Sequence, residues 1–460
     1  MNPYKKLLFL GVVLSVIVIA SIFTWMSKTP DGGDDLASPA SDGVAPMIRI
    51  AWADWAPSNA LQKLSQDFTR ETGIRVEVER ESWATFQAVF FKELAHKGKR
   101  YDMVIGDSQW LGRGSSEGHY IELTKWMKAR AVDRSMTAAS ITGYAEFPKG
   151  SGHLWAVPVE GDAMGFSYRR DLFEDQAEQA AFKARYGYEL DVPITWIQLK
   201  DIAEFFYRPE QDFYGVLIWV EPQYDGLTMG LESLIWAWGA SLGDTQRYRV
   251  QGILNSKQGV EALEFYHALN QFNNPQWRDY YLDTEKNSNQ PMMSGNVAMA
   301  MGYFSINSEL LDPGKNPYAD RVGFFANPKG PGARVSSLGG QGISLISYSK
   351  KKDLSFRFLE WFIREDVQKK WAAMGGLSCN KRVLASKEFL DASPINRPFK
   401  ESIEMAQDFW AVPEYEKLLS ISQKHWSAYI NDGTISASEA MNRIADEWES
   451  VFELAGYYKE

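Results

Sequence analysis

Apolar positions along the chain fall into two patterns, which are short runs and longer stripes that repeat every three or four residues. Residues 48–51, 74–78 and 102–105 are short runs, and such runs indicate β-strands. Two stripes lie between them and consist of Leu61, Leu64 and Phe68 and of Phe86, Phe90 and Leu94. Stripes with this spacing are typical of helices that bury one face. The pattern therefore predicts a βαβαβ unit at the start of the folded region.

The same alternation continues through the rest of the chain. Thr195 and Gln198 have the spacing of a capping box and precede an apolar stripe at Leu199, Ile202 and Phe206. Further strands are predicted at residues 153–158, 165–168 and 216–219, and further helices at 260–272, 353–371 and 436–452. This alternation predicts an α/β fold with largely parallel strands. A chain of 460 residues exceeds the roughly 250–300 that one core supports, so we expect at least two lobes.

Aromatic and polar side chains gather directly after two of the predicted strands. They are Asp54 and Trp55 after the first strand, and Asp107, Gln109 and Trp110 after the third. In open α/β sheets, ligands bind beyond the carboxyl ends of the strands. Flat rings beside hydrogen-bonding oxygens suit a sugar, which has apolar ring faces and a hydroxylated rim. A phosphate would instead favour a Gly-rich loop, and a metal would favour clustered His or Cys.

Later predicted strand ends carry the same kinds of side chain. The carboxylates are Asp162 and Glu221, and the aromatic residues are Tyr224, Tyr303 and Phe304. We include all five among the candidate ligand contacts. Trp52, Trp196 and Trp371 lie within strands or helical stripes instead, and we expect them in the core.

The overall composition narrows the class of partner. The net charge is −10, which argues against nucleic acid as a partner. The chain contains 17 Trp, 21 Tyr and 25 Phe, and most of these rings are expected in the core because large aromatic side chains dominate burial. Cys379 is the only cysteine, so no disulfide can form within the chain.

The first residues resemble a targeting segment. Lys5 and Lys6 precede an uncharged apolar run at residues 7–26, and a polar stretch rich in Asp, Gly, Ser and Pro follows it. Twenty residues of helix rise about 30 Å, which is enough to cross a bilayer core. We expect residues 1–27 to be a signal sequence or an uncleaved signal-anchor, and residues 28–46 to be a flexible linker. Either segment places the rest of the protein outside the cytoplasm.

The sequence argues against three kinds of catalytic site, namely a metal centre, a serine nucleophile and a glycoside-hydrolase carboxylate pair. The five His residues are scattered and no Cys-x-x-Cys occurs, which argues against a metal site. The pattern Gly-x-Ser-x-Gly occurs at Ser116 and at Ser241, but neither serine stands between a strand and a helix as a nucleophile elbow requires. A glycoside hydrolase needs a pair of carboxylates at a defined separation, and the sequence shows no such pair in an apolar setting.

A set of short motifs occurs in a fixed order between residues 47 and 385. They are TGIRV at 72–76, YDMV at 101–104, GHYIEL at 118–123, GHLWAVP at 152–158, SYRRDLF at 167–173, PITW at 193–196 and MSGNVAM at 293–299. In this order the chain resembles the extracellular solute-binding proteins of ABC importers, in the sugar-binding class typified by maltose-binding protein.

The resemblance implies the two-lobed periplasmic binding protein fold, with discontinuous lobes joined by a hinge. Lobe 1 would comprise residues 47–160 and 324–374, and lobe 2 would comprise residues 161–323 and 375–460 with a helical end. By position in the family, ligand contacts would come from Asp54, Trp55, Asp107, Gln109, Trp110, Asp162, Glu221, Tyr224, Tyr303, Phe304, Gly340 and Gln341. No cofactor and no metal is implied.

The sequence therefore predicts a monomeric, non-enzymatic receptor on the periplasmic or extracellular face, tethered to the inner membrane if residues 7–26 are retained. It would close around a sugar or oligosaccharide by hinge rotation and deliver it to the permease subunits of an ABC transporter. Two alternatives stay open at this point, a membrane-anchored ligand sensor and a glycoside hydrolase.

Overall fold

The strand–helix alternation at the start of the folded region builds one side of the first sheet. In the computed structural model, which describes residues 45–280 and 287–458, β1 (Met47–Ala53) pairs in parallel with β2 (Arg75–Glu81) and β3 (Met103–Asp107). Two later strands, β10 (Gln341–Leu345) and β4 (Val157–Glu160), complete the order β2-β1-β3-β10-β4. Strand β10 runs antiparallel to both of its neighbours.

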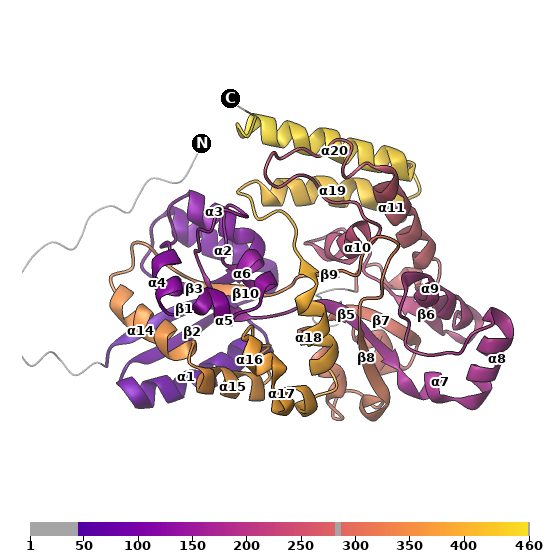
Figure 1. Ribbon diagram of the computed structural model, residues 1–460, viewed down its shortest axis with the longest axis horizontal. Coiled ribbons are helices and arrows are strands. Elements are labelled where there is room, and N and C mark those ends of the chain that lie inside the picture. Colours follow the sequence, from indigo (N-terminus) through magenta and orange to yellow (C-terminus); the bar gives the residue numbers. More distant parts are fainter. Residues whose placement is uncertain (1–44, 281–286, 459–460) are drawn as a thin grey trace, which may run out of the picture. The chain divides into compact units, whose positions relative to one another are not determined.

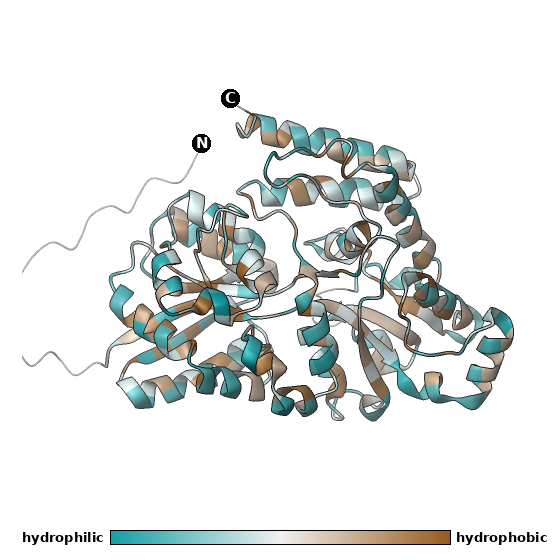
Figure 2. Ribbon diagram, viewed as in Figure 1, coloured by the Kyte–Doolittle hydropathy of each residue, from teal (hydrophilic) through white to brown (hydrophobic). Residues whose placement is uncertain are grey.

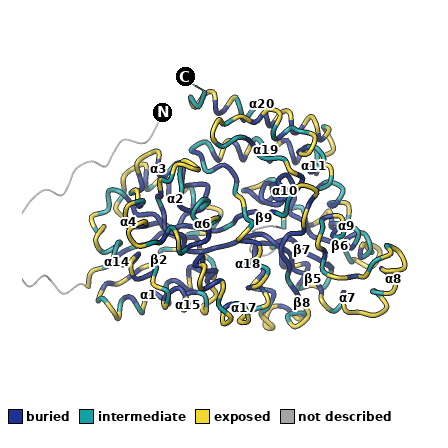
Figure 3. Tube along the Cα trace, viewed as in Figure 1, coloured by how far each residue is buried: buried dark blue, intermediate teal, exposed yellow. Residues whose placement is uncertain are grey.

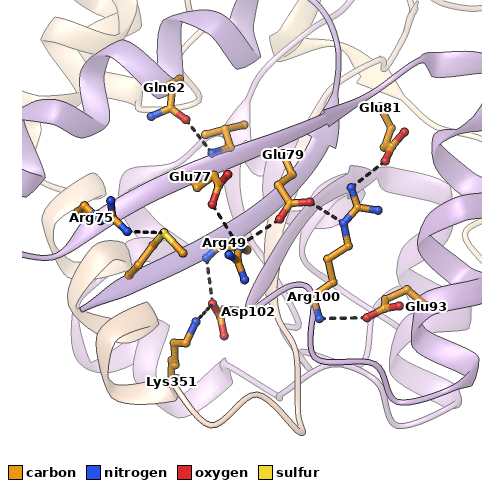
Figure 4. A network of polar contacts seen from close by, with 12 residues as sticks. Arg49, Gln62, Arg75, Glu77, Glu79, Glu81, Glu93, Arg100, Asp102 and Lys351 are labelled. Carbon is orange, nitrogen blue, oxygen red and sulfur yellow. Dashed lines mark hydrogen bonds and ion pairs between the residues drawn. The ribbon is translucent and has the colours of Figure 1, made fainter. Parts of the chain in front are cut away.

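Charged side chains protect the edge of this sheet at β2, which among the described strands pairs only with β1. Arg49 on β1 contacts Glu77 at 3.1 Å and Glu79 at 3.2 Å, and Arg100 contacts Glu79 at 2.5 Å and Glu81 at 3.2 Å (Figure 4). An edge strand offers unpaired backbone groups to other chains, and charged residues discourage such pairing.

A second sheet has the order β6-β7-β5-β8. Its strands are β5 (Met164–Arg169), β6 (Tyr214–Leu217), β7 (Val297–Tyr303) and β8 (Val322–Ala326). Strand β5 is antiparallel to β7 and β8, and only β6 and β7 are parallel. The expectation of largely parallel strands was therefore wrong for this sheet. The periodicity of a strand indicates which of its residues are buried, but it does not indicate the direction of the strand. The direction depends on the long segments that connect the strands.

Helices cover both sheets and turn their apolar stripes inward (Figures 1 and 2). Around the first sheet these are α1 (Ala56–Thr72), α2 (Trp83–Ala95), α3 (Leu111–Ser116), α4 (Thr124–Ala129), α5 (Val132–Ser135), α6 (Ala138–Tyr144), α14 (Lys352–Phe362), α15 (Glu365–Ala373), α16 (Lys381–Ala385) and α17 (Lys387–Ala392). Figure 3 shows that the strands are buried while the outer faces of the helices are exposed. The largest buried side chains include Trp52 and Trp371, as expected from the sequence.

The second sheet and its extension carry the remaining helices. They are α7 (Arg170–Glu174), α8 (Gln176–Tyr186), α9 (Trp196–Phe205), α10 (Gly226–Ala237), α11 (Lys257–Asn270), α12 (Gln290–Ser294), α13 (Phe304–Asn307), α18 (Asn396–Glu404), α19 (Tyr415–Ile430) and α20 (Ala437–Leu454). Short 3₁₀ turns occur at Ser108–Trp110, Pro209–Gln211, Pro275–Trp277, Ser308–Leu311 and Ala319–Arg321. Helices α10, α11, α19 and α20 pack on one another.

Two local predictions can be checked directly. The capping box is confirmed, because the Thr195 hydroxyl accepts the Gln198 amide and the Gln198 side chain accepts the Thr195 amide. Residues 353–371 form two helices instead of one. The chain breaks at Arg364, which is extended, and Glu365 and Asp366 then open α15 at its positive end.

Two short strands lie where the chain passes between the sheets. Strand β9 (Ser336–Ser337) pairs in parallel with β11 (Ala406–Gln407). Residues 161–163 provide another passage, from β4 of the first sheet directly into β5 of the second. These passages hold the ends of the two sheets near one another, and this positions the site.

The predicted targeting segment and most of the predicted linker lie outside the described residues. Within residues 45–280 and 287–458, no helix combines the length and the apolar character needed to cross a membrane.

Candidate ligand-binding site

A cavity of about 60 Å³ lies between the ends of the two sheets. The segments after β1, β2 and β3 provide Trp55, Trp83, Asp107 and Gln109. The second sheet and its loops provide Asp162, Tyr224, Asp225, Tyr303, Ser305 and Ile306. Leu338 and Gly339, on a passage between the sheets, complete the lining. Segments far apart in sequence therefore meet at one small space.

The wall from the first sheet is largely aromatic. Trp55 caps the start of α1 and Trp83 begins α2, so each ring follows directly from a strand. The two rings meet edge to face with centroids 5.5 Å apart. The indole N–H of Trp55 is buried and has no hydrogen-bond acceptor among the described residues. This wall presents an apolar surface and one available donor.

The wall from the second sheet is built around Asp162 and Tyr303. Asp162 lies in the passage from β4 to β5, and its carboxylate accepts hydrogen bonds from the backbone N–H of Ser305, at 3.3 Å, and from the Ser305 hydroxyl. Tyr303 ends β7, and its hydroxyl donates to the Leu338 carbonyl at 3.2 Å. Both side chains are buried, at 1% and 7% exposure, and are held rigidly by these contacts.

Hydrogen bonds join the two sides across the cavity. The Tyr224 hydroxyl donates to Asp107 at 2.8 Å, and the Gln109 amide donates to Asp408 at 2.9 Å. Tyr224 adopts a left-handed backbone conformation with φ of 47°, an uncommon one for a large residue, and its carbonyl accepts the Gln423 amide. These contacts hold the two sides in a closed arrangement.

Burial changes the acidity of the carboxyl groups at this site. Removal from water raises the pKa of Asp107 to about 6, although the Tyr224 hydroxyl partly offsets the effect. The same cause raises the pKa of Asp162 to about 7 against the opposing effect of the Ser305 hydrogen bonds. Both groups therefore titrate near neutral pH.

Six candidate residues predicted from the sequence line this cavity, namely Trp55, Asp107, Gln109, Asp162, Tyr224 and Tyr303. The others lie elsewhere. Asp54 is exposed beside β1, and Glu221 lies at the start of the loop that carries Tyr224. Neither is part of the lining.

The remaining four candidates are packed within the protein. Trp110 is 2% exposed and lies between Phe86, at 5.0 Å, and Phe91, at 5.8 Å. Phe304 is fully buried against Phe399. Gln341 accepts the Trp52 indole N–H at 2.6 Å, and a side chain at Gly340 would meet the Tyr144 hydroxyl. These residues support the site from behind and do not line the cavity.

The sequence pattern of the bacterial extracellular solute-binding protein family matches residues 52–369, which is more than half of the chain. This protein belongs to that family. The match confirms the family predicted from the ordered motifs and confirms a binding protein in preference to an enzyme. It also places the solute-binding protein outside the cytoplasm.

Similar proteins support the fold of this solute-binding protein. A curated relative, the probable amino-acid ABC transporter periplasmic-binding protein y4oP of Sinorhizobium fredii, is 22% identical over 423 residues, or 90% of each chain. An ABC transporter solute-binding protein of Agrobacterium radiobacter K84, solved with ribitol, has a TM-score of 0.73 and 22% identity, covering 89% of this chain and 99% of its own. Maltose-bound MalE3 of T. maritima has a TM-score of 0.72 and 19% identity, covering 88% and 100%. The predicted two-lobed α/β fold is confirmed.

Several site residues of the solute-binding protein were not among the candidates predicted from the sequence. Trp83 follows β2 in the way that Trp55 follows β1, so the same strand-end rule would have found it. Asp408 follows β11, but a strand of two residues leaves no readable periodicity. Leu338 carries no chemical signal and is placed only by the passage between the sheets, whereas Gly339 belongs to the glycine loop that the resemblance placed near the ligand and directly precedes the candidates Gly340 and Gln341.

We predict that the ligand-free solute-binding protein becomes more stable as the pH falls from about 8 to 5.5. The pKa of Asp162 in the folded protein is about 7, above its ordinary value of 3.8, so the folded protein holds a proton that the unfolded chain releases. The contribution of this group is complete below the unfolded pKa and is lost as the pH rises through 7. Thermal unfolding should show a Tm higher by roughly 2–5 °C at the lower pH. Asp162→Asn should flatten this slope, and an unchanged slope in that variant would contradict the assignment.

Proposed function

We propose that this solute-binding protein captures a carbohydrate or polyol in the cavity between its two sheets and delivers it to an ABC importer. One observation carries the proposal. Both sides of the cavity supply aromatic faces, from Trp55, Trp83 and Tyr303, next to polar groups fixed by hydrogen bonds. Ring faces and hydroxyl groups of a sugar require this combination.

Relatives with a similar fold support the class of ligand. The structures from Agrobacterium radiobacter and T. maritima were solved with ribitol and with maltose, and another from Agrobacterium vitis S4 was solved with D-mannitol. Polyols and sugars share a dense set of hydroxyl groups. Either class of ligand could donate hydroxyl hydrogens to the oxygens of Asp107 and Gln109 and accept the indole N–H of Trp55.

The relative from Sinorhizobium fredii is named for amino acids, which suggests a different ligand. An amino acid would need a cation to pair with its carboxylate, and buried charges without partners are costly. Of the cavity-lining residues that the structure describes, none is Lys or Arg. The site therefore favours a ligand without a carboxylate.

The closed arrangement implies how the ligand enters. A cavity of about 60 Å³ that is bridged by the Tyr224–Asp107 hydrogen bond must open to admit a sugar. Binding then favours the closed form because only that form brings both walls to the ligand. We propose that the closed surface is what the permease subunits recognise, and that the receptor acts as a monomer.

A ligand screen tests the proposal. Purified protein is tested by thermal shift against monosaccharides, polyols, malto-oligosaccharides and amino acids, because a bound ligand at a hundredfold excess over Kd stabilises by about 2.7 kcal/mol. Trp55→Ala should then weaken the best ligand by roughly 5- to 20-fold, since a ring beneath a sugar contributes about 1–2 kcal/mol. Trp126→Ala, at a ring that packs on Phe356 outside the site, is the matched control. Equal affinity in Trp55→Ala and Trp126→Ala, or a response to amino acids alone, would refute the proposal.

Residues 7–26 stay a prediction as a membrane anchor, because they lie outside the described residues. An anchor would also suit the alternative of a membrane-bound ligand sensor. The intact mass of the protein recovered from its own cell envelope separates the two cases, since a chain that begins near Ser21 would exclude the anchor.

A further inference from the structure

Four carboxyl groups from three separate segments gather around the buried hydroxyl of Tyr415. Asp107 ends β3, Asp225 directly precedes α10, Glu232 lies within α10 and Asp408 follows β11. Burial raises the pKa of Tyr415, and each of these carboxyls raises it further. Asp107 and Asp225 line the small cavity, whereas Asp408 lines a larger neighbouring cavity of about 340 Å³. Leu338 lines both cavities. The acidic groups therefore stand at the junction of the two spaces.

At this junction Gln109 has a buried acceptor oxygen for which the described residues provide no donor, while its amide donates to Asp408. The Ser108 hydroxyl also contacts Asp408, and the Ser337 hydroxyl donates to Glu232. Gln109 is 2% exposed and lines the small cavity, and Glu232 is fully buried behind Ser337. A buried acceptor without a donor costs about 1–3 kcal/mol, so this arrangement calls for a ligand that brings N–H or O–H groups.

Positive charge is scarce at the same place. Of the described residues that line the two cavities, only Lys149 is basic, and it is exposed. Buried carboxylates are normally paired with a cation or kept protonated. Once Asp107 and Asp408 ionise, they therefore place negative charge at the junction, and Lys149 is the one basic residue among the described lining residues that can offset it.

A metal ion is a poor candidate for the missing cation. In the part of the chain that the structure describes, no group of three or more His, Cys, Asp or Glu is arranged to hold one. An organic ammonium group differs from a metal ion because it donates three hydrogen bonds to separate acceptors without a fixed coordination sphere.

We propose that the solute carries a protonated amine, which binds at the junction against Asp107, Gln109 and Asp408 while its hydroxylated part lies against Trp55 and Trp83. The class of ligand is an amino sugar or an amine-bearing polyol. This inference rests on the proposed function and narrows it. Charge-assisted hydrogen bonds to the ammonium group add to affinity, and the ionised carboxylates select against the neutral analogue.

The linkage to pH gives the proposal a second signature. The carboxyls that face the amine come from β3 and from the segment after β11, and burial raises the pKa of Asp107 to about 6 and of Asp408 to about 7. The other charged groups around them are Glu232 and Asp225 from α10 and its N-terminal flank, Asp162 on the wall of the small cavity, and Glu146, Glu404 and Lys149 on the wall of the larger one. A cation requires ionised carboxyls, so affinity for an amine should fall as the pH drops below about 6. Protonation of the carboxyls lowers the cost of closing the site around a neutral sugar. The affinity for a neutral sugar should therefore not fall as the pH drops below about 6.

The test compares matched ligand pairs by titration calorimetry on the full exported chain. The pairs are glucose and glucosamine, galactose and galactosamine, mannose and mannosamine, and sorbitol and its 1-amino derivative, each at about pH 7.5 and about pH 5. The variants are Asp408→Asn, which keeps the shape of the side chain and removes its charge, and Asp320→Asn, which removes a charge from an exposed position.

For at least one pair, the amine should bind about tenfold or more tightly at the higher pH and lose that advantage at the lower pH. Asp408→Asn should reduce the preference to less than about threefold, whereas Asp320→Asn should preserve it. Neutral members that bind as well as their amines, or a preference that survives Asp408→Asn, would overturn the inference and leave the proposed function standing. No binding by any sugar or polyol would overturn both.

Discussion

Gly112→Ala is expected to lower ligand affinity by roughly 30- to 100-fold without unfolding the protein. Gly112 lies in α3, beside the first sheet, and a Cβ atom there would stand 1.9 Å from the carbonyl oxygen of Ala411. It would also stand 2.9 Å from the carbonyl carbon of Val412. These are backbone atoms of the segment that leads into α19, so no side-chain rotation can relieve the overlap.

The expected loss follows from the closed arrangement. When α3 cannot approach residues 411–412, the two sides cannot form the Tyr224–Asp107 and Gln109–Asp408 hydrogen bonds. The variant then populates mainly the open form. Its apparent affinity for the ligand falls in proportion to the fraction of molecules that can still close. Once α3 and residues 411–412 move apart, the overlap with the Ala411 carbonyl is relieved, so stability should change by less than about 1 kcal/mol.

Affinity is measured by calorimetry with the best ligand of the screen, and the lobe arrangement by small-angle X-ray scattering with and without that ligand. Ser116→Ala changes an exposed position in the same helix and should bind normally. A Gly112→Ala protein that compacts on ligand addition and binds within about threefold of the parent would contradict the role given to this contact.

Trp448→Ala should have the largest effect on stability, a loss of roughly 3–5 kcal/mol. The Trp448 side chain is fully buried in α20, and its indole N–H donates to the Leu418 carbonyl at 2.7 Å. Its ring meets Phe409 at 5.5 Å and Trp410 at 6.3 Å. Truncation leaves a large cavity beneath the segment that carries Asp408.

Urea unfolding followed by circular dichroism measures this loss. Trp448→Phe keeps a ring but loses the hydrogen bond, and it should lose only about 1–2 kcal/mol. Because the segment that carries Asp408 packs on the same ring, Trp448→Ala should also weaken ligand binding. Full ligand affinity together with a loss below about 1 kcal/mol would show that this ring does not support the segment.

The start of the fold could be predicted because its signals are local. The stripes at Leu61, Leu64 and Phe68 and the alternation in residues 74–78 report burial directly, and α1 and β2 form where they indicate. The direction of the strands in the second sheet could not be predicted, because it depends on connections whose paths leave no pattern in the sequence.

Trp55 and Trp110 show how far the site could be predicted from the sequence. Both residues directly follow a strand, so the sequence predicts the same role for each. Trp55 faces the cavity, whereas the 3₁₀ turn Ser108–Trp110 directs Trp110 back toward Phe86 and Phe90. The strand-end rule therefore finds the right segment, but the turn that follows decides which side chain faces the cavity. Asp408 is harder to predict, because β11 places it beside Gln109 although the two residues are some 300 positions apart in the sequence.

The position of β10 has a consequence for how the protein is made. Strand β10 inserts between β3 and β4 and pairs with both, yet the entire second sheet is encoded between β4 and β10. The first sheet therefore cannot close until residue 345 has emerged from the ribosome or the export channel. Folding that waits for such distant pairings is slow. Strands β3 and β4 therefore remain without their shared partner while the whole of the second sheet is being made.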